Sequence, residues 1–164
     1  MKLAVTVQMA SSRRGVPHAR SLNRWAQAAC AHHAPRGEGE LALTIRIVGA
    51  AESRRLNRTW RSKDKPTNVL SFPAAPLAPG DKGVPSRFST NRFSELGDLA
   101  ICAPVVAREA REQAKPAQAH WAHMVVHGVL HLLGFDHEND RDASVMEARE
   151  VKILAQLGYD NPYA

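Results

Sequence analysis

The chain has few cysteines and no long apolar run. Its 164 residues include only Cys30 and Cys102, which lie far apart and belong to no metal-ligand pattern. We therefore expect buried free thiols in a reducing cytoplasm rather than a disulfide. The first ten residues soon turn polar and no signal-peptide cleavage site follows them. No other run approaches the roughly 20 apolar residues of a membrane-spanning helix, so the sequence predicts a cytoplasmic protein without a membrane segment.

The sequence also lacks internal repeats and low-complexity linkers. The chain has 164 residues, of which 44% are hydrophobic, so it is long enough and apolar enough to enclose one core. We therefore predict a single domain over residues 1–164. Acidic residues are in the minority, with 16 Asp and Glu against 22 Lys and Arg, and the formal net charge is +6. This excess of positive charge favours a polyanionic partner.

Hydrophobic periodicity predicts alternating strands and helices. Alternating or β-branched residues predict strands at 3–8, 41–48, 69–72 and 99–102. Helical spacing predicts helices at 17–33, 51–61, 104–113 and 116–133. A last helix is expected to begin with the capping-box pattern Ser144-x-x-Glu147 and to bury a stripe from Val145 to Leu157. Residues 74 to about 91 read as a long loop, either a lid or binding element or an ordinary insertion.

Three histidines recur around one glycine in the segment HGVLHLLGFDH, residues 127–137. On a helix, His127 and His131 lie on the same face one turn apart. Gly134 follows the helical run and can adopt the left-handed conformation that ends a helix, returning His137 toward the pair. Three histidine ligands with an open fourth position are typical of a catalytic zinc site, so we predict one Zn²⁺ held by these three residues.

Two neighbouring residues leave alternatives open. His123 precedes His127 by four positions, so this pair is also geometrically possible, but the downstream glycine favours His127 and His131. His123 is then expected to pack, to support a ligand from the outer shell or to face the substrate. Asp136 either accepts the second N–H of a ligand imidazole or caps the turn, and the sequence favours neither.

The residue after the first histidine separates this motif from that of zinc proteases. Metalloproteases with a similar layout carry a glutamate there as general base, whereas this chain has Gly128. Peptide hydrolysis therefore lacks its usual base. A phosphodiester requires a polarised nucleophile, charge neutralisation on the phosphoryl oxygens and help for the leaving oxygen, and zinc can contribute to each.

A basic segment, RRLNRTWRSKDK, occupies residues 54–65. Its cations are Arg54, Arg55, Arg58, Arg61, Lys63 and Lys65. Helical spacing of the arginines predicts a ridge able to meet phosphates, because each guanidinium can grip two phosphate oxygens. A solvated helix face is the alternative. The large apolar area of Trp60 favours a core anchor over a base-stacking platform.

Together with LNRTWRSKDKPTNVLSFP at 56–73 and LGDLAIC at 96–102, the histidine motif resembles the YbeY family of bacterial endoribonucleases and rRNA maturation factors. The segments AHWAHMVV and LGYDNPY are also similar to that family, so the resemblance covers the chain from the second predicted strand onward. It implies an α+β fold, with a small mixed sheet of about four strands flanked by helices. It also implies one zinc ion at the end of a central helix and cleavage of single-stranded RNA.

The resemblance further implies work on the ribosome. Family members mature the 3′ end of small-subunit rRNA and act in ribosome assembly and quality control. Implied partners are the small ribosomal subunit, one of its proteins and an Era-type GTPase. Residue by residue, the family's zinc ligands fall on His127, His131 and His137, and its functionally important arginine falls on Arg61. We therefore hypothesise that zinc polarises a water or the scissile phosphate while Arg61 stabilises charge on the phosphoryl oxygens.

Two other classes of protein remain compatible with the sequence. One is a non-enzymatic ribosome assembly factor that binds rRNA through the basic segment and uses zinc only for structure. The other is a metal hydrolase acting on a peptide or small ester, which Gly128 disfavours.

Overall fold

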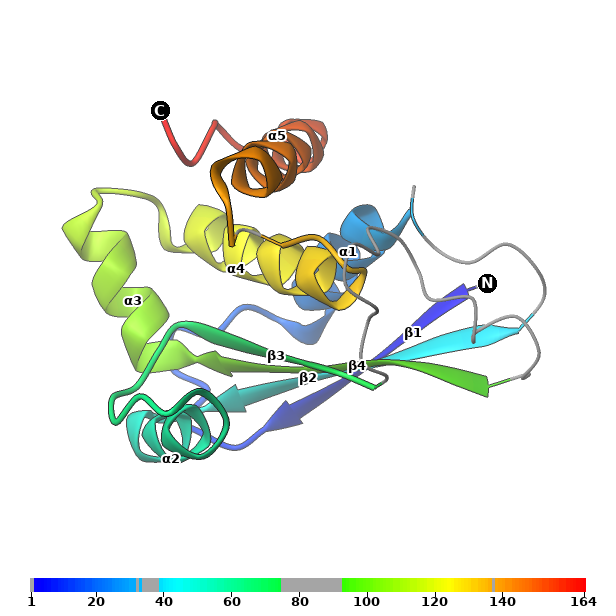
Figure 1. Ribbon diagram of the computed structural model, residues 1–164. Helices are drawn as coiled ribbons and strands as arrows, with labels where there is room; N and C mark the ends of the chain where they lie inside the picture. Colours follow the sequence, from blue (N-terminus) through cyan, green and yellow to red (C-terminus); the bar gives the residue numbers. More distant parts are fainter. Residues whose placement is uncertain (1, 32, 34–38, 75–92, 137) are drawn as a thin grey trace.

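The computed structural model describes residues 2–31, 33, 39–74, 93–136 and 138–164 (Figure 1). These residues form one four-stranded mixed sheet and five helices. The strands are β1 (Lys2–Met9), β2 (Glu40–Val48), β3 (Val69–Pro73) and β4 (Phe93–Cys102). The helices are α1 (Ala19–Cys30), α2 (Ala50–Arg61), α3 (Ala103–Glu112), α4 (Ala117–Leu132) and α5 (Asp140–Gln156). The expected α+β fold with a small mixed sheet is confirmed.

The sheet has the strand order β1-β2-β4-β3. Strand β2 pairs in parallel with β1 and β4, whereas β3 pairs antiparallel with β4 and forms one edge. Helices α1 and α4 lie over one face of the sheet, α5 lies outside α4, and α2 lies over the other face (Figure 1). Along β2, Leu41, Leu43, Ile45 and Ile47 are all buried. The alternation predicted for this strand therefore points its apolar side chains into one core.

Helix α4 lies at the centre of the molecule and is apolar on nearly every side. It packs against α1, α3, α5, β3 and β4, and its buried residues include His120 and His123 as well as Trp121 and Val125. A helix that is hydrophobic all round belongs in the interior of a fold. The histidines that it carries are consequently held between the sheet and α5.

Three predicted boundaries were wrong. Helix α1 begins at Ala19 and ends at Cys30, so Pro17 precedes the helix rather than lying in its first turn. Strand β4 begins at Phe93 instead of 99, so Gly97, which preceded the predicted strand, lies within β4 at a φ of +142°. A Cβ atom on Gly97 would lie 2.3 Å from the carbonyl oxygen of Phe72, so glycine permits this close strand approach.

Helix α5 begins one turn earlier than the capping-box pattern predicted. Asn139 is the N-cap, and its side chain accepts a hydrogen bond of 2.9 Å from the backbone N–H of Asp142. The hydroxyl of Ser144 instead donates to the carbonyl of Asp140. The predicted apolar stripe was wrong in part, because Val145 is 40% exposed, whereas Leu154 within that stripe is buried. The residues that α5 buries are Met146, Glu150, Ile153 and Leu154.

Three other expectations concern cysteines, membrane segments and the long loop. Cys30 and Cys102 are free and buried, as predicted, and burial raises the pKa of the Cys30 thiol to about 11. Among the described residues, no helix combines the length and apolarity needed to cross a membrane. The predicted loop falls almost wholly on residues 75–92, which lie outside the described residues.

Candidate metal centre

Four histidines follow one another along α4. The ring centroids of His120 and His123 are 6.2 Å apart, those of His123 and His127 are also 6.2 Å apart, and those of His127 and His131 are 4.7 Å apart. The spacing of three or four residues places all four rings along one side of the helix. The predicted pair, His127 and His131, has the closest rings and lies in the last two turns of α4.

Helix α4 ends in the chain reversal that Gly134 predicted. Gly134 has a φ of +99°, and its N–H donates to the carbonyl of His131. The next N–H, from Phe135, reaches back to the carbonyl of Leu130 at 3.0 Å. These two bonds define a Schellman motif. The side chain of Phe135, the residue after Gly134, is buried in the core and helps to hold this turn. His137 lies outside the described residues, so its assignment as the third ligand stays a prediction.

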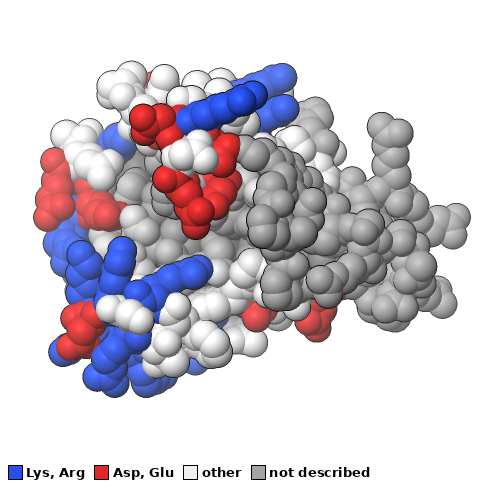
Figure 2. All heavy atoms as spheres, in the orientation of Figure 1, with Lys and Arg blue, Asp and Glu red and all other residues white. Residues whose placement is uncertain are grey.

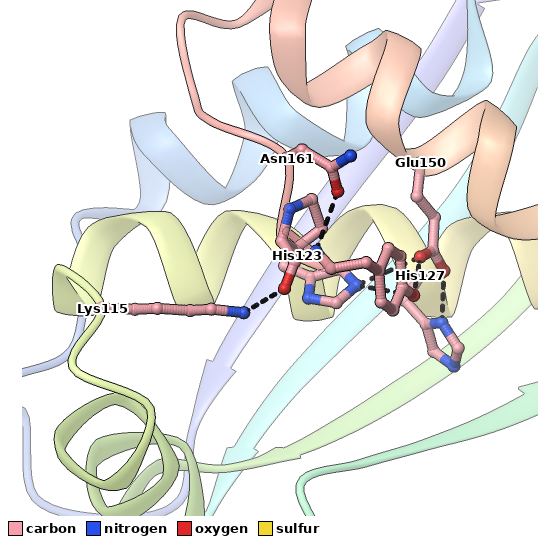
Figure 3. A network of polar contacts seen from close by, with 7 residues as sticks. Lys115, His123, His127, Glu150 and Asn161 are labelled. Carbon is pink, nitrogen blue, oxygen red and sulfur yellow. Dashed lines mark hydrogen bonds and ion pairs between the residues drawn. The ribbon is translucent and has the colours of Figure 1, made fainter.

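A buried carboxylate on α5 faces these histidines (Figure 3). Glu150 is 0% exposed. Its Oε1 atom lies 2.5 Å from Nδ1 of His127, and its Oε2 atom lies 3.1 Å from Nε2 of His123. The hydroxyl of Tyr163 donates to Oε2 as well. Glu150 therefore joins two histidines of α4 to the C-terminal segment.

The hydrogen bonds around Glu150 keep it ionised. Burial raises the pKa of this carboxyl, but hydrogen bonds from His123 and His127, the charge of His127 and the Tyr163 hydroxyl outweigh burial and lower the pKa to about 2. An ionised carboxylate only accepts hydrogen bonds, so Nδ1 of His127 carries the proton. When that imidazole is neutral, its Nε2 atom keeps the lone pair that a metal requires.

The described residues include one group able to hold a metal ion, formed by His123, His127 and Glu150. Their candidate ligand atoms all lie within 4.8 Å of one another. Sequence reasoning identified both histidines but not Glu150 or Tyr163. The one signal for Glu150 is a carboxylate on the same face of α5 as Met146 and Ile153, but the sequence alone does not show that this face is the buried one.

Gly128 lets α4 lie directly on the sheet. A Cβ atom at this position would lie 2.8 Å from Cδ2 of Leu99 on β4 and 3.3 Å from Cγ2 of Val69 on β3. In addition, the hydroxyl of Ser71 on β3 donates to the carbonyl of Gly128 at 3.3 Å. A side chain at the position that carries the catalytic glutamate in zinc proteases would thus have to displace Leu99 here.

We expect Gly128→Ala to lower the free energy of unfolding by about 1 kcal/mol. Overpacking destabilises a fold by about 1–3 kcal/mol, whereas the higher helix propensity of alanine stabilises a helix by up to about 1 kcal/mol relative to glycine. Denaturant unfolding measures the difference. The double variant Gly128→Ala with Leu99→Val should lose less than the sum of the two single losses, and strict additivity would contradict the steric explanation.

The basic segment is exposed, but several of its cations are paired. All six predicted cations are exposed, and Lys and Arg side chains gather on the surface over α2, at the lower left of Figure 2. Arg54 binds both carboxylate oxygens of Asp64 at 2.8 and 2.9 Å. Weaker ion pairs join Arg58 to Asp64 and Arg55 to Glu52. The ridge therefore carries less free positive charge than its sequence indicates.

Arg61 lies at the edge of the sheet nearest α4. Its Nη2 atom donates to the carbonyl of Ser71 at 3.2 Å, and the Ser71 hydroxyl contacts Gly128 on α4. One residue of the edge strand β3 thus contacts both Arg61 and the helix that carries the histidine pair. Among the described residues this hydrogen bond uses one of the five N–H groups of Arg61.

The prediction that Trp60 anchors the core was wrong. Its side chain is 64% exposed, and its ring meets Phe72 edge-to-face with centroids 6.2 Å apart. The buried positions of α2 are polar residues, Ser53 and Asn57, which bond to the backbone of Thr67 and Lys65. Trp60 lies in the last turn of α2, beside the edge strand, where no further layer of the described structure covers it.

His120, the first histidine of α4, and the predicted outer-shell residue Asp136 lie at opposite ends of that helix. His120 is buried, and its Nε2 atom lies 3.0 Å from Oε1 of Glu109. Asn68 donates to the same carboxylate oxygen at 3.1 Å. Asp136 is half-buried in the segment after the Schellman motif. Its assignment to the outer shell of a metal site stays a prediction.

A groove of about 370 Å³ lies between α2 and the sheet, apart from the histidines. Arg46 and Arg55 line it together with Glu52, Asp98 and Phe72. Arg46 is bound to both oxygens of Glu52 at 2.7 and 2.8 Å, and the two cations of the groove balance its two carboxylates. None of the described histidines lines this groove, so the imidazole pair on α4 is the better candidate for the functional site.

Comparison with known proteins identifies the family. Residues 7–158 match the family described as "Endoribonuclease YbeY". A protein of that name from Stenotrophomonas maltophilia is 51% identical over 164 residues, covering 100% of this chain and 95% of the relative. Another from Alkalilimnicola ehrlichii is 54% identical over 151 residues, covering 92% of this chain and 84% of the relative.

The fold has a counterpart among solved structures. The solution structure of a Thermotoga maritima protein aligns with a TM-score of 0.59 and 23% identity. The alignment covers 93% of this chain and 89% of that protein. This likeness concerns the fold, whereas the family match and the sequence relatives cover nearly the full chain. On those grounds the chain belongs to the YbeY family of endoribonucleases.

Proposed function

We propose that this protein is a zinc-dependent endoribonuclease that cleaves single-stranded RNA. The observation that carries the proposal is the imidazole pair at the end of α4, with His127 held by a buried carboxylate. Family membership supports RNA as the substrate, because the relatives are named endoribonucleases. The exposed cations over α2 supply the positive surface that a polyanionic strand requires.

The residues present fit a zinc ion. We propose that His127, His131 and His137 hold it, since neutral imidazoles are preferred zinc ligands and the contact between Nδ1 of His127 and Glu150 would make Nε2 the ligand atom of His127. When bound, zinc supplies Lewis-acid polarisation of a water or a phosphoryl oxygen. Asp136 and His123 would support the ligands from the outer shell.

We propose that Arg61 binds the scissile phosphate. It contacts the Ser71 carbonyl on β3, and Ser71 in turn contacts α4 at Gly128, one residue from His127. A planar guanidinium there can bind phosphoryl oxygens and stabilise the charge that grows on them during cleavage. We propose that Arg54, Arg55, Arg58, Lys63 and Lys65 bind neighbouring RNA phosphates and position the strand.

The biological setting is proposed from the family resemblance. Single-strand cleavage would serve maturation of the 3′ end of small-subunit rRNA in the cytoplasm, together with ribosome assembly and quality control. Partners would be the small ribosomal subunit, one of its proteins and an Era-type GTPase. One domain comprising residues 1–164 would carry all of these activities.

The direct test is cleavage of a defined RNA by protein of measured zinc content. We expect a single-stranded RNA to be cut, and the same sequence annealed to its complement to resist. Chelation should stop cleavage, and added zinc should restore it. Specific RNA binding by fully zinc-loaded protein, with no cleavage above that of a buffer control, would instead identify a non-enzymatic assembly factor.

A further inference from the structure

We propose that Glu150 and Tyr163 are positioning residues of the metal centre, through which the C-terminal segment fixes the orientation of His127. In this arrangement Tyr163 holds Glu150, and Glu150 holds Nδ1 of His127. The Glu150–His127 contact is visible in Figure 3. Nε2 would then be the atom through which His127 binds the metal. The proposal rests on the proposed metal-dependent function, because it assigns a role toward the ion that His127 would bind.

The hydrogen bonds of Glu150 leave one oxygen for His127. Its Oε2 atom accepts from Nε2 of His123 at 3.1 Å and from the Tyr163 hydroxyl. Its Oε1 atom contacts Nδ1 of His127 at 2.5 Å. Because Oε2 already has two donors, the carboxylate is held in a rotation that aims Oε1 at His127. A carboxylate held in this way fixes both the tautomer and the ring orientation of a ligand histidine.

The distances distinguish a hydrogen bond from shared metal ligation. Zinc lies about 2.1 Å from nitrogen and oxygen ligands, so two ligands of one tetrahedral ion stand roughly 3.4 Å apart. The 2.5 Å between Oε1 of Glu150 and Nδ1 of His127 is much shorter than that separation. It matches a charge-assisted hydrogen bond. Glu150 therefore acts on the ion through His127 rather than as a direct ligand.

The C-terminal segment is anchored so that Tyr163 reaches Glu150. The chain turns just after α5 at Gly158, which has a φ of +91°, and then returns to the start of α4. There the Lys115 ammonium donates to the carbonyl of Pro162, and the Asn161 side chain accepts from the N–H of Tyr163 at 2.8 Å. The Tyr163 ring packs edge-to-face on His123, with centroids 5.3 Å apart.

The Tyr163 hydroxyl serves as a donor at every physiological pH. Burial raises the pKa of this phenol well above its usual range, and the hydrogen bond to ionised Glu150 and the charge of Glu150 raise it further. The hydroxyl consequently keeps its proton and donates it to the carboxylate. Removing that donor would loosen Glu150 without removing any metal ligand.

The first test is Glu150→Gln, which keeps the side-chain shape and removes the charge. Loss of an outer-shell partner typically costs about 10–100-fold in metal affinity, and we expect a loss of that size in chelator competition with zinc. At saturating Co²⁺, the visible absorption spectrum should match that of the native protein, because the ligand set is intact. Glu112→Gln, an equal change of charge on exposed Glu112 in α3, should leave the affinity unchanged.

The second test is Tyr163→Phe, which removes one hydroxyl and keeps the ring. We expect a smaller loss of zinc affinity, about 2–5-fold, because Glu150 keeps its contact with His123. In the double variant, Tyr163→Phe should add little to Glu150→Gln, since both act through the same contact with His127. The single Tyr163→Phe variant keeps the proposal testable if the Glu150→Gln protein does not fold, which circular dichroism of the zinc-free protein would reveal.

Three results would overturn the proposal. Native zinc affinity in a folded Glu150→Gln protein, or native affinity in Tyr163→Phe, would show that these residues position nothing. An altered cobalt spectrum in Glu150→Gln would make Glu150 a direct ligand. Failure of the proposed function is distinguishable from all three, because the native protein itself would then bind zinc weakly or fail to cleave RNA.

Discussion

We expect His131→Ala to lose zinc and to abolish cleavage of single-stranded RNA, while the fold is retained. His131 lies in the last turn of α4, half-buried, with its ring 4.7 Å from that of His127. The neighbouring core residues Leu130 and Leu132 anchor that turn, so truncating His131 leaves the helix in place. Loss of one of three ligands should reduce retained zinc from about one ion per chain to near zero.

The experiment compares His131→Ala with the native protein purified in parallel. Metal content is measured by elemental analysis, cleavage with a defined single-stranded RNA and folding by circular dichroism. His18→Ala is the matched control, because His18 is exposed before α1 and its side chain makes no cap hydrogen bond. Native cleavage by a metal-free His131→Ala protein would end the proposal and point to a contaminating ribonuclease or to metal-independent chemistry.

The local part of the site could be predicted because it depends on neighbouring residues. Helical spacing alone places His127 and His131 on one face. Gly134 adopts the expected left-handed conformation because the helix must end with its last carbonyls satisfied. Both inferences need only the preference of a few consecutive residues, and no knowledge of how α4 packs was required.

The partners of this pair could not be predicted because they depend on packing. Glu150 is 23 residues from His127 and meets it only because α5 lies on α4. In the sequence of α5, a stripe from Val145 to Leu157 and a stripe through Met146 and Ile153 are both compatible with a helix. Only the second buries Glu150, and choosing between them requires the position of the neighbouring helix.

The predictions for Trp60 and for the start of β4 were wrong for related reasons. Burial of Trp60 was expected from its size, but the last turn of α2 lies beside an edge strand with only Phe72 in ring contact among the described residues. The predicted strand began at residue 99, after Gly97, whereas Gly97 lies within β4 and allows β3 to approach it closely. In both cases the neighbouring strands, whose positions the sequence does not show, decided the environment of the residue.

Arg61→Ala should keep zinc and the fold yet lower the single-turnover rate of RNA cleavage by about 10²–10³-fold. A loss of this size follows when one group that stabilises transition-state charge is removed. Arg61 is exposed, and within the described part of the chain its hydrogen bond goes to the Ser71 carbonyl on the edge strand. Its removal therefore costs little stability. The loss should appear in the rate at saturating protein rather than in RNA affinity alone.

Two comparison variants separate this role from general electrostatics. Arg61→Lys keeps the charge but not the planar fork, so it should recover only part of the rate. Arg108→Ala makes the same change in net charge on α3, where the guanidinium is exposed and 3.8 Å from Glu112, and should cleave like the native protein. If Arg61→Ala binds RNA more weakly but cleaves at the native rate once saturated, Arg61 positions the strand and takes no part in the chemical step.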